Sequence, residues 1–366
     1  MHRCKVFLDR YKKSGKNLII VNRLTAKGEC LMPSTIKDVS KVAGVSTATV
    51  SNVITGKKYV GPELHQKVVD AMNKLSYKPN IMARSLKVNK TFKISVVVPN
   101  IANPFFSEII KVIEESLDGT EYQMILYNTN SNPQKENEVF KALVENNQND
   151  GIILVGARLS DEILNYYWKL PIVLADHPII QGQNNLSFIV NDNFKASKEI
   201  ANVIYEKGFK KFACITGPEE SPSAKVRLSG FLSKLEECGV DTDEVSVYKG
   251  EFSFEHGYNS AIKLAKKIQK ENEKTGVFIC SDLVAWGAME GFKKMGLEIA
   301  QDVGIISYDD IFYAKYLHPG LTTYHNSTNE IGKKAATMIL RLLSSGANFT
   351  TLVDEVDGWI EYRESI

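Results

Sequence analysis

Short apolar runs alternate with longer amphipathic stretches along most of this chain, from Lys93 to its last residues. The short runs have the length and the β-branched composition of strands, whereas the longer stretches have the apolar spacing of helices. Strands that alternate with helices indicate parallel sheets covered on both faces. Because the strands are too many for one small sheet, we predict two α/β lobes with a cleft between them.

The elements of this region can be placed approximately from the pattern. The predicted strands are Ile94–Val98, Met124–Tyr127, Ile152–Val155, Ile172–Ala175, Phe212–Ile215, Val277–Cys280 and Val303–Ser307. The predicted helices lie near residues 104–117, 133–147, 193–207, 224–238, 257–271, 283–295 and 329–343. Two last strands, near Leu352–Val356 and Trp359–Ile360, are expected to cross back and complete the sheets.

The charge of the chain is divided unevenly along its length. Residues 1–31 hold eight Lys and Arg against Asp9 and Glu29, a balance of +6. Residues 32–93 hold eleven basic residues against three acidic ones, a balance of +8, whereas residues 94–366 have a balance of −12. A basic region joined to an acidic one suggests that the basic part meets a polyanion. A solvated basic tail is the alternative.

Composition excludes several classes of protein. Hydrophobic residues make up 43% and charged residues 24% of the chain, the balance of an ordinary globular protein. No uncharged apolar run approaches the ~20 residues of a membrane span, so we expect no membrane partner. The five cysteines, at positions 4, 30, 214, 238 and 280, are scattered and form no CxxC pair. We therefore expect reduced thiols and a cytoplasmic location.

Residues 1–31 do not resemble a secretory signal. Their basic residues continue to Lys27, and their longest apolar stretch is only Leu18–Val21. Met32 stands immediately before the first well-patterned helix, and codons for Lys27-Gly28-Glu29 could form a ribosome-binding site. Our hypothesis is that Met32 is the natural start, and that residues 1–31 are otherwise a disordered extension.

Three short helices are predicted between Thr35 and Pro79. Ile36, Val39 and Ala43 repeat at helical spacing, and Gly44 follows where that helix must stop. Ser46 can cap a second helix, and Pro62 suits the first position of a third, which is expected to end at Pro79. Two helices joined by a tight turn with Gly have the arrangement of a helix-turn-helix.

Residues 35–90 resemble the DNA-binding region of lactose-repressor (LacI/GalR-type) regulators of bacteria. The matching segments are TIKDV, AGVS, ATVSNV, YKPN and ARSLK, in this order. The resemblance continues to the end through IANPFFSEII, GFKKFACITGP, SAKVRLSGF, CSDLVAWGAMEG, VGIISYDD, HPGLTTY and YRESI. It implies an all-α helix-turn-helix headpiece (32–79), a hinge helix and linker (80–93), and a two-lobed α/β body (94–366). Such bodies resemble periplasmic sugar-binding proteins, and two chains form a dimer on a pseudo-palindromic operator in double-stranded DNA.

The second helix presents short polar side chains that suit the major groove. The candidates for reading bases are Thr47, Ala48, Ser51 and Asn52. Asn52 can pair with adenine, although many family members have Arg at this position. The candidates for phosphate contacts are Ser34, Thr49, Lys57, Lys58 and Tyr59. The alternative is that these residues only solvate a surface helix.

Residues 80–87 are too few to form a stable helix alone in water. In the resembled family this piece is a hinge that folds in the minor groove when two copies meet. The resemblance assigns Asn80, Ala83, Arg84 and Leu86 to this hinge, with Leu86 as the apolar wedge that bends the duplex. The alternative is that Leu86 packs on the body.

Polar residues follow several predicted strands, at the edge where open α/β sheets bind ligands. The candidates for binding a small-molecule effector are Phe105, Asp176, Arg227, Phe252, Asp282 and Asp309. Carboxylates, one Arg and an aromatic face suit a sugar or sugar derivative, whose hydroxyls donate and accept. Asp282 could instead cap a helix, Asp309 could order its loop, and Phe252 could belong to the core. Ser281 stands where sugar-responsive relatives often have Asn.

No catalytic signature is present in the sequence. It contains no GxGxxG after a strand, no GxxxxGK[ST], no HExxH and no GxSxG, and its six histidines do not cluster. We therefore expect no catalytic residues, no metal and no cofactor. The prediction is a DNA-binding transcriptional regulator, most often a repressor, controlled allosterically by an effector. The alternative is a periplasmic-type solute-binding protein without a DNA role.

Overall fold

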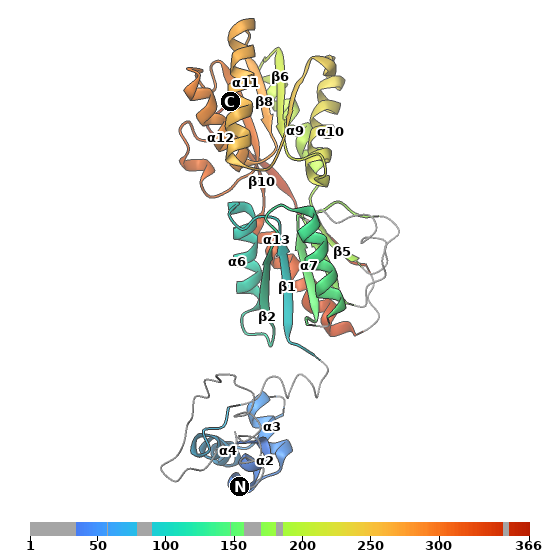
Figure 1. Ribbon diagram of the computed structural model, residues 1–366, viewed down its shortest axis with the longest axis vertical. Coiled ribbons are helices and arrows are strands. Elements are labelled where there is room, and N and C mark those ends of the chain that lie inside the picture. The colour runs from blue at the N-terminus through green and yellow to red at the C-terminus, as the bar shows by residue number, and fades with distance from the viewer. Residues whose placement is uncertain are drawn as a thin grey trace, which may run out of the picture. The chain divides into compact units, whose positions relative to one another are not determined.

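The computed structural model describes residues 34–56, 58–78, 90–146, 148–156, 170–180, 186–346 and 351–366 (Figure 1). The chain divides into two compact units that join after Lys87. We call the described residues up to Lys78 the headpiece, and those from Lys90 onward the body. Several predictions lie outside the described residues: the N-terminal extension 1–31, Lys57, and the hinge residues Asn80, Ala83, Arg84 and Leu86.

The headpiece has the three predicted helices, α2 (Ile36–Ala43), α3 (Thr47–Thr55) and α4 (Pro62–Lys74). Gly44 ends α2 with a left-handed φ of 65°, and the hydroxyl of Ser46 accepts the backbone N–H of Thr49 at 3.0 Å. The side chains of Val39, Val50 and Val68 are fully buried, one from each helix. The prediction that α4 continues to Pro79 was wrong.

Helix α4 ends five residues before Pro79 because Ser76 takes a left-handed φ of 47°. A non-glycine residue with this φ cannot continue a right-handed helix. The N–H of Tyr77 then bonds back to the carbonyl of Met72 at 2.9 Å, which closes the last turn. Local backbone geometry, and not proline, sets this boundary.

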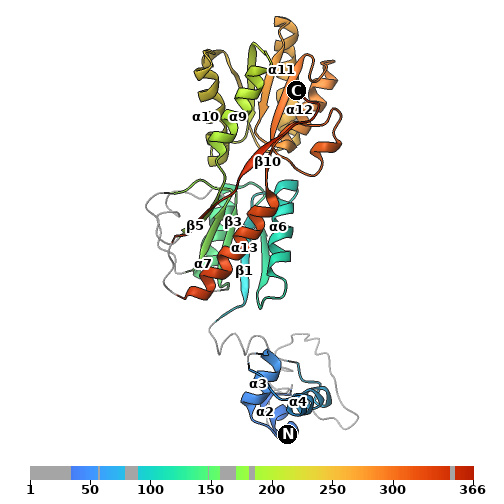
Figure 2. The same ribbon diagram turned by 180° about the vertical axis from the view of Figure 1, so that it is seen from behind.

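The first lobe of the body is a six-stranded parallel sheet. Its order is β11-β5-β4-β3-β1-β2. The strands are β1 (Lys93–Val98), β2 (Gln123–Asn128), β3 (Gly151–Val155), β4 (Ile172–Ala175), β5 (Leu186–Val190) and β11 (Val353–Glu355). Helices α6 (Pro104–Leu117) and α13 (Thr328–Ser345) pack together on one face, and α7 (Pro133–Glu145) covers the other (Figures 1 and 2).

The second lobe has a similar sheet in the order β12-β10-β9-β8-β6-β7, in which only β12 is antiparallel to its neighbour. The strands are β6 (Lys211–Thr216), β7 (Ser246–Lys249), β8 (Thr275–Ile279), β9 (Val303–Asp309), β10 (Thr323–Asn326) and β12 (Gly358–Glu361). The helices are α9 (Asn193–Glu206), α10 (Pro222–Glu237), α11 (Phe254–Glu271) and α12 (Asp282–Lys294). Helices α9 and α10 cover one face, and α11 and α12 cover the other.

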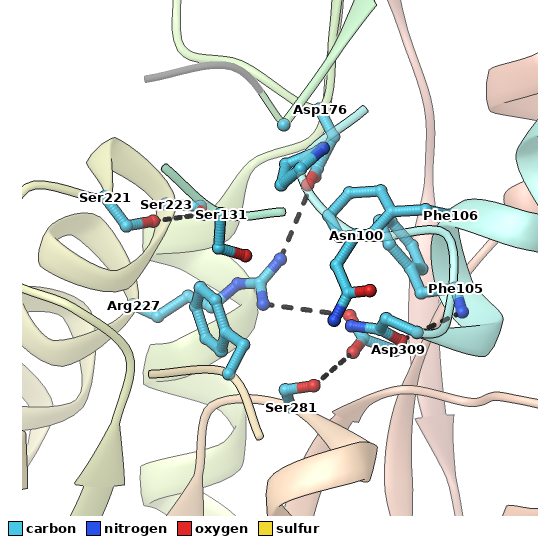
Figure 3. A pocket seen from close by; sticks show the side chains of 14 residues that line it. Asn100, Phe105, Phe106, Ser131, Asp176, Ser221, Ser223, Arg227, Ser281 and Asp309 are labelled. Atoms are coloured by element: carbon cyan, nitrogen blue, oxygen red, sulfur yellow. Dashed lines mark hydrogen bonds and ion pairs between the residues drawn. The ribbon is translucent and has the colours of Figure 1, made fainter. Parts of the chain in front are cut away.

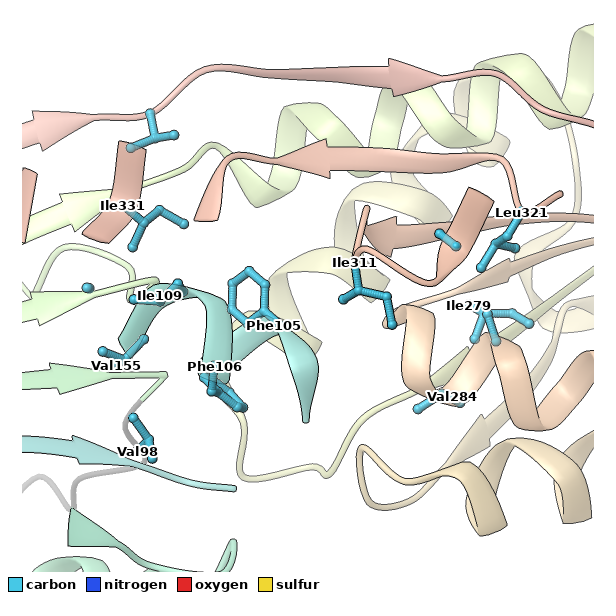
Figure 4. Close-up of a cluster of buried hydrophobic side chains, with 14 of the residues drawn as sticks. Val98, Phe105, Phe106, Ile109, Val155, Ile279, Val284, Ile311, Leu321 and Ile331 are labelled. Carbon is cyan, nitrogen blue, oxygen red and sulfur yellow. The ribbon is translucent and has the colours of Figure 1, made fainter. Parts of the chain in front are cut away.

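The two predicted α/β lobes are confirmed. The chain passes between them three times: from β5 to α9, from β10 to α13, and from β11 to β12. The apolar core is continuous where the lobes meet, because Phe105 of α6 and Ile311 of the second lobe belong to one buried cluster (Figure 4). Side chains at the carboxyl ends of both sheets can therefore meet across this contact.

A glycine on each of α11 and α12 brings these two helices into close contact. A Cβ at Gly257 would lie 1.9 Å from the carbonyl oxygen of Val284, and one at Gly287 would lie 2.0 Å from that of Phe254. Such distances are shorter than any van der Waals contact, so the helices must separate to accept a side chain.

We expect Gly257→Ala to lower the free energy of unfolding by about 1–3 kcal/mol, because the added methyl group forces α11 away from α12. Urea denaturation followed by circular dichroism measures this loss. Asn259→Ala, at an exposed position of the same helix, is the matched control and should change stability little. Equal stability of the two variants would contradict the close packing.

Candidate functional site

Arg227 is the centre of a polar cluster between the lobes (Figure 3). Its side chain on α10 is only 3% exposed, so its charge is buried. The guanidinium donates to the side-chain oxygen of Asn193 at 2.6 Å and to the carbonyl oxygen of Cys280 at 2.8 Å. Its central carbon lies 3.6 Å from the ring centroid of Tyr308. Arg227 is therefore held in one orientation from several sides.

Two carboxylates balance the charge of Arg227. Asp176, which follows β4 in the first lobe, lies 3.8 Å from one guanidinium nitrogen, and Asp309, at the end of β9, lies 3.7 Å from another. Burial raises the pKa of both carboxyl groups, and Arg227 lowers it in part. Both ion pairs are longer than a hydrogen bond, so hydroxyl groups of a ligand have room to bond to either partner.

The backbone at this site is locally strained. Ser131, Asp176 and Asp309 have φ values of 55°, 53° and 120°, in the left-handed region that non-glycine residues rarely occupy. All three line the same cavity. Left-handed residues that gather around one cavity are typical of ligand-binding sites, where the surrounding structure holds the strain.

Aromatic rings form the apolar walls of the cavity. Phe105 and Phe106, at the start of α6, pack edge to face with ring centroids 5.3 Å apart. Phe252, on the loop before α11, also lines the cavity, and a Cβ at Gly217 would lie 2.2 Å from its ring. The ring of Phe252 therefore rests directly on backbone that only glycine leaves uncovered.

The cavity that these residues enclose is small. The space left free is about 30 Å³, enough for roughly two water molecules. Any larger ligand enters only if the lobes or the lining side chains move apart. The lining residues are Pro99, Asn100, Asn103, Phe105, Phe106, Ser131, Gly156, Asp176, Ser221, Ser223, Arg227, Phe252, Ser281 and Asp309.

The structure brings five of the six predicted effector residues to this cavity: Phe105, Asp176, Arg227, Phe252 and Asp309. Asp282 is the sixth, and it does not line the cavity. Its carboxylate accepts hydrogen bonds from Ser307, from Thr323 at 2.7 Å and from the backbone N–H of Ile311 at 2.8 Å. It does not cap α12 either, because no side-chain hydrogen bond caps that helix.

Sequence reasoning missed several residues of the site. Ser281 donates to Asp309 at 2.9 Å, Asn193 holds Arg227, and Asn191 donates to Asp176 at 3.1 Å. Tyr308 forms the surface beneath the guanidinium. Two signals were available: Tyr308 precedes an aspartate at the end of a strand, and Ser281 stands where sugar-responsive relatives often have Asn.

Of the predicted DNA-contact residues that the structure describes, all but Ser34 lie on α3 or in the segment that follows it. Thr47 and Ala48 are exposed, whereas Ser51 and Asn52 are half-buried. Lys58 is exposed, and Tyr59 is 90% exposed. The hydroxyl of Thr49 bonds to that of Ser46 at 2.9 Å, and the hydroxyl of Ser34 donates to the carbonyl of Leu75 at 3.0 Å. Ser34 would have to give up Leu75 as its acceptor in order to donate to a phosphate.

The residues that line the interlobe cavity offer several kinds of group to a ligand. Among the described residues, no group of His, Cys, Asp and Glu has an arrangement that could hold a metal ion. None of the described helices has a stretch long and apolar enough to cross a membrane. One buried cation, two carboxylates, amides, hydroxyls and aromatic rings can bind a small molecule rich in hydroxyl groups.

Comparison with known proteins covers both parts of the chain. Residues 35–80 match the model of bacterial regulatory proteins of the lacI family, and residues 201–366 match a periplasmic binding protein-like domain. The transcriptional repressor PurR of Mannheimia succiniciproducens is 34% identical over 313 residues, which cover 85% of this chain and 91% of PurR. The ribose operon repressor of Escherichia coli is 31% identical, covering 85% of this chain and 93% of that repressor.

Solved structures have the same architecture. The lac repressor dimer bound to operator aligns with a TM-score of 0.74 at 23% identity, over 91% of this chain and 99% of that one. A LacI family regulator from Enterococcus faecium with bound ribose aligns with a TM-score of 0.63 at 25% identity, over 75% and 98%. With its helix-turn-helix, its two-lobed body and relatives above 30% identity along most of its length, this chain belongs to the lacI family of bacterial regulatory proteins.

Proposed function

We propose that this chain is a transcriptional repressor whose affinity for its operator is controlled by a small molecule bound in the interlobe cavity. The cavity around Arg227 carries this proposal, because it joins polar groups of both lobes. A ligand there changes the relative free energies of two lobe arrangements by its difference in affinity for them. Because the target is chromosomal DNA, the protein acts in the cytoplasm. A solute-binding protein without a DNA role would have no use for the headpiece.

The repressor binds a pseudo-palindromic operator as a homodimer, with one headpiece on each half-site. In the single chain, Phe312, Tyr313 and Tyr316 are 56%, 47% and 58% exposed and lie beside one another. Exposed aromatic groups of this kind are typical of an interaction surface. A second copy of the chain would cover them.

Sedimentation of the purified protein should give a dimer. A stable tetramer or a monomer would contradict this part of the proposal.

The effector is an uncharged sugar or sugar derivative. Arg227 already has two carboxylate partners, so the cavity has no positive charge to spare for a phosphate or carboxylate ligand. Its amides and hydroxyls instead suit groups that both donate and accept. The names of the ribose operon repressor and of the ribose-bound family structure agree with this class of ligand.

Selection of bound duplexes from a random pool, at physiological salt, tests the regulator directly. A recovered pseudo-palindrome supports the proposal and identifies the half-site. Repeating the selection with a panel of sugars and nucleosides shows which compounds release or promote binding. Failure to recover a motif under every condition would contradict operator binding.

We expect Asn52→Ala to weaken specific binding by about 1–3 kcal/mol through loss of a base contact, with little change in non-specific binding. Lys58→Ala should weaken binding to all duplexes and lower the slope of log affinity against log salt by about one. Electrophoretic mobility shifts on operator and random duplexes at several salt concentrations measure both effects. Equal losses on both duplexes for Asn52→Ala would remove it from base reading.

The proposed hinge is tested through Leu86. As an intercalating wedge, Leu86 contributes to binding only where the duplex is bent. Leu86→Ala should therefore weaken binding to the operator more than binding to random DNA. An equal loss on both kinds of duplex, measured by mobility shift, would contradict the wedge.

We expect Arg227→Lys to abolish the effector response while operator binding is kept. Lysine preserves the charge beside Asp176 and Asp309, but its ammonium cannot reproduce the planar set of donors. Calorimetry with D-ribose and operator titrations with and without it measure the two properties. Lys225→Ala, exposed on the same helix, is the control. A retained response in Arg227→Lys would place the effector elsewhere.

A further inference from the structure

Asp282 is a buried carboxylate that the interlobe cavity does not use. Its side chain is 1% exposed, and its three hydrogen-bond donors come from three different parts of the second lobe. Ser307 belongs to β9, Thr323 to β10, and Ile311 to the loop that follows β9. No lysine or arginine of the described chain pairs with it. Its contacts therefore hold protein segments together.

The segment that Asp282 holds is Asp309–Phe312. It starts with Asp309, which faces the cavity and is bonded to Ser281, the residue next to Asp282. Two positions later, the N–H of Ile311 bonds to Asp282. The next N–H, that of Phe312, donates to the carboxylate of Glu108 in the first lobe at 3.2 Å. Four consecutive residues thus link the cavity to the other lobe.

Glu108 joins this link to the first lobe. Its second carboxylate oxygen accepts the hydroxyl of Thr328, at the start of α13, at 3.1 Å. Glu108 lies on α6, three residues after the cavity residue Phe105. If effector binding shifts Asp309, the hydrogen bond between Phe312 and Glu108 must therefore lengthen or reorient, unless the intervening residues change conformation instead.

We propose that Asp282 is a positioning residue for the effector response. It contacts no effector; by fixing Ile311, it directs Asp309 into the cavity and Phe312 toward Glu108 of the first lobe. The inference rests on the proposed function, because it assumes that a ligand binds at Asp309. It replaces the earlier expectation that Asp282 itself binds the effector.

The burial of Asp282 makes a conservative variant practical. Burial raises the pKa of Asp282 to about 7, because the charged form loses its hydration. Because asparagine has nearly the same shape and carries no charge to bury, Asp282→Asn is expected to fold. An asparagine can turn its oxygen toward the Ile311 N–H and its amide toward the hydroxyls of Ser307 and Thr323, which can also accept.

The test compares Asp282→Ala with Asp282→Asn in the full-length protein. Without ligand, Asp282→Ala should speed amide hydrogen exchange at Ile311 and Phe312 by about tenfold, the factor expected for one lost hydrogen bond. It should weaken binding of D-ribose, or of the compound that the selection identifies, by about tenfold, with operator affinity unchanged. Asp282→Asn should restore both properties. Glu290→Ala, exposed on the same helix, is the control.

Each outcome decides between the alternatives. Unchanged exchange in Asp282→Ala would mean that Asp282 does not hold the segment, which overturns the proposal. If Asp282→Asn restores exchange but not ligand binding, the carboxylate itself contacts the effector, and the positioning role is wrong. If the wild-type protein binds no sugar or nucleoside, the proposed effector class fails, and the exchange measurement alone still decides whether Asp282 holds the segment.

Discussion

The buried charge of Arg227 is the constraint on which the rest of the body depends. A guanidinium that is 3% exposed is tolerated only if carboxylates and carbonyl groups surround it. Asp309 and the carbonyl of Cys280 come from the second lobe, whereas Asp176 comes from the first. The lobes therefore cannot separate without changing the surroundings of this charge. Their contact is electrostatic as well as apolar, and a ligand that replaces one of these partners changes the free energy of that contact.

This constraint explains how a small molecule could control the protein. In the arrangement described, the cavity has about 30 Å³ of free space, so a sugar cannot enter without movement. If the proposed function holds, an effector would stabilise a different arrangement, in which its hydroxyls lie between Arg227 and the carboxylates. The shift that it produces is limited by its difference in affinity for the two arrangements, typically worth about 1–3 kcal/mol. Such a difference needs only one or two hydrogen bonds that one arrangement cannot form.

The sequence predicted the elements better than their contacts. The period of the apolar residues placed α6, α7, α9 and α12 within a few residues, because each buries one clear face. It missed β7 and β10, which are only four residues long and have no apolar run of their own, and it also missed β5, although Phe188–Val190 is apolar. Ligands bind beyond the carboxyl ends of the strands in open α/β sheets, and this tendency identified Asp176 and Asp309 as cavity residues. It could not show that Asp282 differs from these two and lies outside the cavity. That difference depends on where Ser307, Thr323 and Ile311 lie in space, and these contacts span 25 to 41 residues.

The uneven charge of the chain bears on how sharply binding can be controlled. Residues 94–366 have a balance of −12, so the body is repelled by DNA, whereas residues 32–93 have a balance of +8. Most of the favourable electrostatic contact with the operator is then expected from the N-terminal part, whose basic side chains can neutralise phosphates. If the proposed function holds, contacts confined to the headpieces are kept only while both headpieces match the half-site spacing. A lobe arrangement that changes this spacing would then change the affinity for the operator.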